Sequence, residues 1–199
     1  MPFEADVIRR GSGGTTDMSE HEYNAASPGA SRSLTDGVSV QETENQEGID
    51  FSINGNAVSF SGDPEKPLLY VLRNDAGLNG PKFGCGVAQC GSCEVLVDGE
   101  TVISCTTPVE DVAESEVTTT RGLGTSDDPH PVQEAFIEAQ AAQCGYCIHG
   151  MIVEAAALLE ENPDPSDEEI DDALADNLCR CGTHDEIRTA VNRAAEEMN

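Results

Sequence analysis

The sequence predicts an α+β fold, in which a small mixed sheet precedes a bundle of four short helices. Three observations lead to this prediction. Residues 49–120 show alternating apolar positions and two hairpin turn signals. Beyond residue 130, apolar residues recur at helical spacing. The eight cysteines of the 199-residue chain fall into two sets of four, one set in each of these segments.

Two hairpins and a last strand make up the predicted sheet. The hairpins turn at Asn54-Gly55 and Asp98-Gly99, which are strong two-residue turn signals. The expected strands cover residues 49–53, 57–60, the two arms of 94–103, and 116–120. Pro67 can open a single helix between the hairpins. A small mixed sheet with one helix is consistent with a β-grasp domain, which we expect over residues 49–122.

Four amphipathic segments make up the predicted bundle, after a linker over residues 121–130. Their apolar faces are centred on Val132 and Phe136, on Met151 and Leu159, on Ile170 and Leu174, and on Ile187 and Val191. Capping boxes are expected at the start of the last two helices, Ser166 with Glu169 and Thr183 with Glu186. We expect this helical domain over residues 129–199.

The net charge of −28 limits the classes of partner. Nucleic acid is excluded as a partner, because binding it requires a basic surface and Lys66 and Lys82 are the only lysines. The acidity fits either a docking surface for a basic partner or the salt-tolerant surface of a halophile, and we favour the halophile. Residues 1–48 are polar and acidic without apolar periodicity, so we expect a disordered acidic tail there.

The compartment follows from the cysteines and from the absence of a targeting signal in the sequence. No apolar run reaches the roughly 18 residues of a membrane span, so no span is expected. No signal peptide is recognised either. We therefore expect a cytoplasmic protein. In that reducing compartment, eight cysteines point to metal or redox chemistry rather than to disulfides.

The first set of cysteines has an iron–sulfur spacing. It consists of Cys85, Cys90, Cys93 and Cys105. The pattern C-x4-C-x2-C with a distal fourth cysteine is that of plant-type [2Fe–2S] ferredoxins. Nearby glycines allow the chain to curl closely around a cluster, so that backbone N–H groups reach its sulfurs. Zinc is the alternative, but zinc sites usually combine two C-x2-4-C hooks.

The second set has a less specific spacing. It consists of Cys144, Cys147, Cys179 and Cys181. A C-x2-C hook alone is compatible with zinc or with a thioredoxin-like redox pair, although no βαβ pattern surrounds it. The C-x-C pair at a helix end favours a second iron–sulfur cluster, and zinc stays open at this point.

The chain resembles the small iron–sulfur subunits of the molybdenum hydroxylases, the xanthine oxidase family. This family includes aldehyde oxidoreductases, carbon monoxide dehydrogenases and isoquinoline oxidoreductases. The motifs that carry the resemblance lie at residues 82–93, 142–147 and 177–182, and it extends over about residues 49–197. It implies an electron-transfer subunit of an oxidoreductase, with an outer [2Fe–2S] cluster on the first set and an inner one on the second. Substrate chemistry would take place on another polypeptide.

The resemblance also implies partners. Gln143 matches a glutamine that contacts the molybdopterin cofactor, which a separate large subunit binds. The electrons would end on FAD in a medium subunit or on another acceptor. The family commonly has Pro-Gly after the hook, whereas this chain has His149-Gly150. We expect His149 to sit at a helix start without a special role. The alternatives are a stand-alone two-cluster ferredoxin and a zinc-stabilised interaction module.

Overall fold

The structure, a computed structural model, describes residues 48–199. The predicted acidic tail lies outside the described residues, except for Gly48. The elements in chain order are β1 (Ile49–Ile53), β2 (Asn56–Phe60), α1 (Leu68–Tyr70), η1 (Val71–Asp75), β3 (Glu94–Val97), β4 (Glu100–Ile103), η2 (Val109–Val112), β5 (Glu116–Thr118), α2 (Thr120–Leu123), α3 (Pro131–Glu138), α4 (Ile148–Glu161), α5 (Asp167–Ala173) and α6 (His184–Met198).

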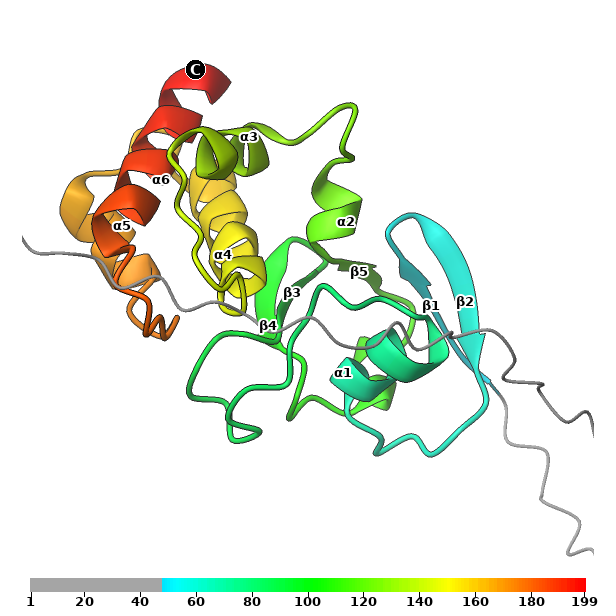
Figure 1. The fold of residues 1–199 in the computed structure, drawn as a ribbon. Coiled ribbons are helices and arrows are strands. Elements are labelled where there is room, and N and C mark those ends of the chain that lie inside the picture. The colour runs from blue at the N-terminus through cyan, green and yellow to red at the C-terminus, as the bar shows by residue number, and fades with distance from the viewer. Residues whose placement is uncertain (1–47) are drawn as a thin grey trace, which may run out of the picture. The chain divides into compact units, whose positions relative to one another are not determined.

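The strands form one mixed sheet in the order β2-β1-β5-β3-β4 (Figure 1). β1 and β5 are parallel, and the other neighbours are antiparallel. Both predicted hairpins are present, and their turns have positive φ angles, for example 51° at Asn54 and 52° at Asp98. We call β1 to β5 with α1 the sheet half, and α3 to α6 the helical half.

The last strand is shorter than predicted. β5 ends at Thr118, whereas the sequence suggested that the strand continues to Thr120. The reason is that the Thr119 hydroxyl accepts a hydrogen bond from the Arg121 backbone and starts the short helix α2. Part of the predicted linker is therefore helical.

The sheet half has its own apolar core. Pro67 directly precedes α1, as predicted, and α1 continues as a single π-helical turn, η1. Leu68 and Leu72 from this helical segment pack with Phe51, Val95 and Val117 from the strands. Burial of these apolar side chains holds the helix against the sheet.

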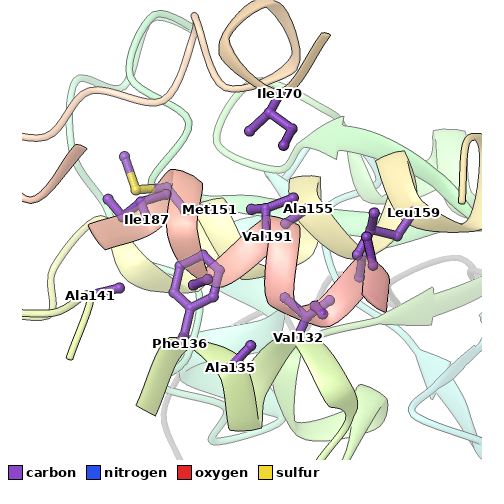
Figure 2. Close-up of a cluster of buried hydrophobic side chains, with 14 of the residues drawn as sticks. Val132, Ala135, Phe136, Ala141, Met151, Ala155, Leu159, Ile170, Ile187 and Val191 are labelled. Carbon is purple, nitrogen blue, oxygen red and sulfur yellow. The ribbon is translucent and has the colours of Figure 1, made fainter. Parts of the chain in front are cut away.

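The four predicted helices are all present and share a second core. Figure 2 shows Phe136 of α3, Met151 of α4 and Ile187 of α6 converging in it, and Ile170 of α5 belongs to the same cluster. Within residues 48–199, no helix is long and apolar enough to cross a bilayer.

Of the two predicted capping boxes, one is confirmed and one is wrong. Ser166 and Glu169 form the box that starts α5. Thr183 makes no capping bond for α6, because it is buried and its hydroxyl lies 3.7 Å from the Cys179 sulfur. A third box, His130 with Gln133, starts α3 and was not predicted.

Candidate metal centres

The first set of cysteines lies in the sheet half. Cys85, Cys90 and Cys93 belong to the loop between η1 and β3, and Cys105 follows β4. Cys85 is exposed, whereas the other three are buried. The set therefore has one side that is open to a partner and another that faces the protein.

Backbone N–H groups of this loop point at the sulfurs, as the sequence predicted. The N–H groups of Val87 and Gln89 lie 3.4 and 3.2 Å from the Cys85 sulfur. The N–H of Cys85 lies 3.3 Å from the Cys90 sulfur. The first two donors lower the pKa of the Cys85 thiol to about 7. Such donors suit the negative charge that thiolates and sulfides of a cluster carry.

Gly84 leaves the space that this loop needs. A Cβ atom at Gly84 would lie 2.6 Å from the Cys90 sulfur, which is too close for any side chain. The neighbouring Gly86 has a φ of 70°, a left-handed conformation that glycine adopts without strain.

The second set lies in the two loops of the helical half that precede α4 and α6. Cys144 and Cys147 come before α4, and Cys179 and Cys181 come before α6. Cys147 and Cys179 are buried, Cys144 is exposed and Cys181 is half-buried. This set therefore also has an open side and a closed side.

The thiols of each set come in close pairs. The sulfurs of Cys144 and Cys181 lie 3.4 Å apart. Burial raises the pKa of the Cys147 thiol to about 12, and its neighbour Cys179 contributes to the increase. Cys93 also has a pKa raised to about 12, by burial and by its neighbour Cys105.

This arrangement fits a two-iron cluster better than a zinc ion. In a [2Fe–2S] cluster, each iron takes two thiolates, so two pairs of thiols are needed rather than four thiols around one point. The N–H donors and the clearance at Gly84 meet the further needs of a cluster.

The closed sides of the two sets meet where the halves of the molecule join. The backbone N–H of Leu178 donates to the carbonyl of Cys90 at 3.1 Å. Since Leu178 directly precedes Cys179, this hydrogen bond joins a cysteine of the first set to the residue next to a cysteine of the second. The Tyr146 hydroxyl also donates to the carbonyl of Phe83, two residues before Cys85.

A buried polar pair lies beside this junction. The Asn177 side chain donates to the Glu94 carboxylate at 2.7 Å. Glu94 is 4% exposed, and burial raises its pKa to about 7. The pairing of these two residues was not predicted, although a charged residue at the start of an apolar strand was a signal.

Gln143 and His149, which were also singled out in the sequence, differ in their burial. Gln143 is exposed and directly precedes Cys144. His149 was expected to have no special role, but it is buried and hydrogen-bonded across the junction to Glu94 and Thr120. Its position at the start of α4 was predicted correctly.

Three stretches that contain seven of the eight cysteines have no acidic residues. The stretches 76–93, 139–153 and 177–184 contain no Asp or Glu, although the chain has 38 of them. Four of the exposed large apolar side chains lie within two residues of a cysteine: Phe83, Val87, Tyr146 and Leu178. We call the exposed residues of these three stretches the acid-free surface. Exposed apolar side chains that lie close together are typical of a protein interface.

Two family models match the chain. Residues 51–120 match the 2Fe-2S iron-sulfur cluster binding domain, and residues 119–192 match the [2Fe-2S] binding domain. Together, the matches include both sets of cysteines.

Relatives with known roles match over most of their own length. The chain is 55% identical to one of the subunits of nicotinate dehydrogenase from Pseudomonas putida, covering 74% of this chain and 94% of the relative. It is 49% identical to the alpha chain of isoquinoline 1-oxidoreductase from Brevundimonas diminuta, covering 75% and 98%.

Solved structures share the fold. The aldehyde oxidoreductase of Desulfovibrio desulfuricans matches with a TM-score of 0.74 and 41% identity over 76% of this chain. The match covers only 17% of that longer protein. Quinoline 2-oxidoreductase of Pseudomonas putida matches with a TM-score of 0.72 and 36% identity, covering 76% of this chain and 95% of that chain.

Proposed function

The chain belongs to the small iron–sulfur subunits of the molybdenum hydroxylase family and serves electron transfer in an oxidoreductase. From this premise, we propose that Cys85, Cys90, Cys93 and Cys105 hold an outer [2Fe–2S] cluster. Cys144, Cys147, Cys179 and Cys181 would hold an inner one. Electrons would pass from a molybdopterin centre to the inner cluster, and then through the outer cluster to an acceptor.

One observation carries the proposed transfer between the two sites: the hydrogen bond between the Leu178 N–H and the Cys90 carbonyl. It links the closed sides of the two sets, while Cys144 and Cys85 remain exposed on their open sides. A relay needs this arrangement, with an open edge for each outside partner and a short connection between the centres. When bound, the two clusters supply the one-electron redox chemistry.

The partner that we propose for the inner side is a large subunit that holds molybdopterin. Gln143 is exposed beside Cys144, where its amide can contact a cofactor presented by another polypeptide. On the outer side, a medium subunit with FAD is the proposed acceptor. The acid-free surface supports docking of protein partners at the cysteine loops.

The substrate class that we propose is an N-heteroaromatic compound. It rests on the relatives at 55% and 49% identity, whose names specify nicotinate and isoquinoline. We also propose that the protein works in the cytoplasm, because a reducing compartment keeps its thiols available for clusters.

Elemental analysis of the natural complex tests this function. The protein is purified with an affinity tag from its native host, at high salt and without oxygen, and iron and molybdenum are quantified. We expect iron for two clusters per chain, together with molybdenum and a large subunit. Nicotinate and isoquinoline are then compared with an aldehyde as substrates.

Other results would contradict parts of the proposal. Iron without molybdenum or a partner would instead indicate a stand-alone two-cluster ferredoxin. A colourless protein that contains zinc would exclude both iron–sulfur sites. Turnover of the aldehyde alone would overturn the proposed substrate class but not the electron-transfer role.

A further inference from the structure

His149 links the two cluster loops through both of its ring nitrogens. The imidazole is 6% exposed and lies in the first turn of α4, two residues after Cys147. Nε2 lies 2.9 Å from the Glu94 carbonyl oxygen, and Nδ1 lies 2.8 Å from the Thr120 hydroxyl. A carbonyl only accepts hydrogen bonds, so these partners assign the proton to Nε2, and the Thr120 hydroxyl donates to Nδ1.

Both partners of His149 lie outside the helical half. Glu94 begins β3 and directly follows Cys93, and Thr120 begins α2 just after β5. The imidazole therefore ties the helix that follows Cys147 to the strand that follows Cys93. One side chain connects the flanks of a ligand from each proposed cluster.

The ring fits closely into the sheet half. A Cβ atom at Gly80 would lie 2.8 Å from Nδ1, so the ring occupies the space that a side chain would take there. Next to His149, a Cβ atom at Gly150 would lie 2.1 Å from the Gly91 carbonyl oxygen. The start of α4 thus packs directly against the backbone of the first cysteine loop, with little room to shift.

We propose that His149 is a positioning residue that fixes the separation of the two clusters for electron transfer between them. This inference rests on the proposed function, since it requires both clusters. Electron-transfer rates and magnetic interactions between clusters both fall steeply with separation. An imidazole with two fixed hydrogen bonds therefore keeps the transfer step fast and uniform across molecules.

The test compares His149→Leu with His149→Gln in the complete complex. Leu fills part of the space without hydrogen bonds, whereas Gln can donate to the Glu94 carbonyl and accept from Thr120. Thr189→Leu is the control, because Thr189 is an exposed residue of α6 that lies outside the acid-free surface. The readouts are cluster content by visible absorption, the spin–spin splitting of the EPR signals with both clusters reduced, and the rate of intercluster transfer in a single turnover.

We expect His149→Leu to retain both EPR signals but to show weaker, broadened splitting and severalfold slower transfer. His149→Gln should restore both, and Thr189→Leu should match the wild type. Unchanged splitting and transfer in His149→Leu would overturn the proposal, even if the variant melts at a lower temperature. If His149→Gln behaves like His149→Leu, the hydrogen bonds are not what positions the clusters, and the proposal also fails.

A second variant decides the matter if His149→Leu does not assemble. Thr120→Val removes only the hydroxyl that donates to Nδ1 and leaves the hook sequence intact. Weaker splitting with both signals at full intensity supports the positioning role, and unchanged splitting overturns it. The wild-type complex is measured first, because missing clusters there would refute the proposed function rather than the role of His149.

Discussion

At the scale of single residues, each set of cysteines is self-contained. The close thiol pairs join Cys144 with Cys181 and Cys147 with Cys179, and no thiol of one set contacts a thiol of the other among the described residues. The link between the sets runs through backbone atoms of Cys90 and Leu178 instead. Replacing one thiol should therefore remove one cluster without removing the connection.

The variant Cys90→Ser tests this independence. We expect it to lose the EPR signal of the outer cluster, because a serine hydroxyl is a poor substitute for a thiolate ligand. The signal of the inner cluster should persist, since the Cys90 carbonyl still accepts from Leu178. EPR spectra of the reduced protein provide the measurement, with Ser92→Ala as a control in the same loop. Loss of both signals would show that the two clusters assemble only together.

At the scale of elements, sequence patterns identified most helices and strands but not how they meet. Alternation and the Asn54-Gly55 turn were sufficient for the first hairpin, because both signals are local. The recurrence of apolar residues at helical spacing was sufficient to predict α4 and α6 for the same reason.

What sequence analysis missed depends on contacts between distant segments. The role of His149 could not be predicted, because it arises from Glu94 and Thr120, which lie 55 and 29 positions away. The capping box expected at Thr183 failed because burial near Cys179 determines where that hydroxyl points. The spacing of the cysteines was readable because a cluster imposes it on the chain locally.

His130, which caps the start of α3, should make the stability of the protein depend on pH. His130 Nδ1 accepts a hydrogen bond from the Val132 backbone at 3.3 Å. Burial lowers the pKa of His130 below its ordinary value of 6.5, and the nearby Glu160 opposes this shift. Because the folded pKa is the lower one, the contribution of His130 to stability is complete above pH 6.5 and is lost as the pH falls through the folded pKa.

The variant His130→Asn keeps an acceptor for the cap but does not titrate. We expect the melting temperature of the wild type to fall more than that of the variant between neutral and mildly acidic pH. Other titrating groups affect both proteins equally, so the difference between the two curves isolates His130. Parallel curves would show that protonation of His130 does not affect folding.

At the scale of the whole molecule, charge is the dominant property. The net charge is −28, and the ion pairs formed within residues 48–199 involve only Lys66, Arg188 and Arg193 as cations. Within these residues, most carboxylates therefore form no ion pair with a cation, and they repel one another. Such self-repulsion disfavours the compact state unless salt screens it.

The melting temperature should consequently rise from dilute buffer to molar KCl. This increase is what the halophile interpretation of the sequence predicts, and circular dichroism at a series of KCl concentrations measures it. The complex with clusters is used throughout, so that cluster loss is not mistaken for a salt effect. Equal melting temperatures across the series would contradict the halophile interpretation.

Attachment of the large subunit at the acid-free surface should not weaken as the salt concentration rises. Attachment of the large subunit through apolar contacts is not weakened by screening, whereas attachment through ion pairs would be. Leu178 is the natural site to test, because it is 69% exposed and directly precedes Cys179. A carboxylate placed there would be buried without a partner in the interface.

We expect Leu178→Asp to lose the large subunit, measured as the ratio of molybdenum to iron after affinity purification. The control Thr189→Asp adds the same charge on α6, outside the acid-free surface, and should keep the ratio of the wild type. For the wild type, the ratio should hold or increase from dilute buffer to molar KCl. A ratio that falls with salt would mean that ion pairs hold the subunits together, and the acidic surface would then be the docking site for a basic partner.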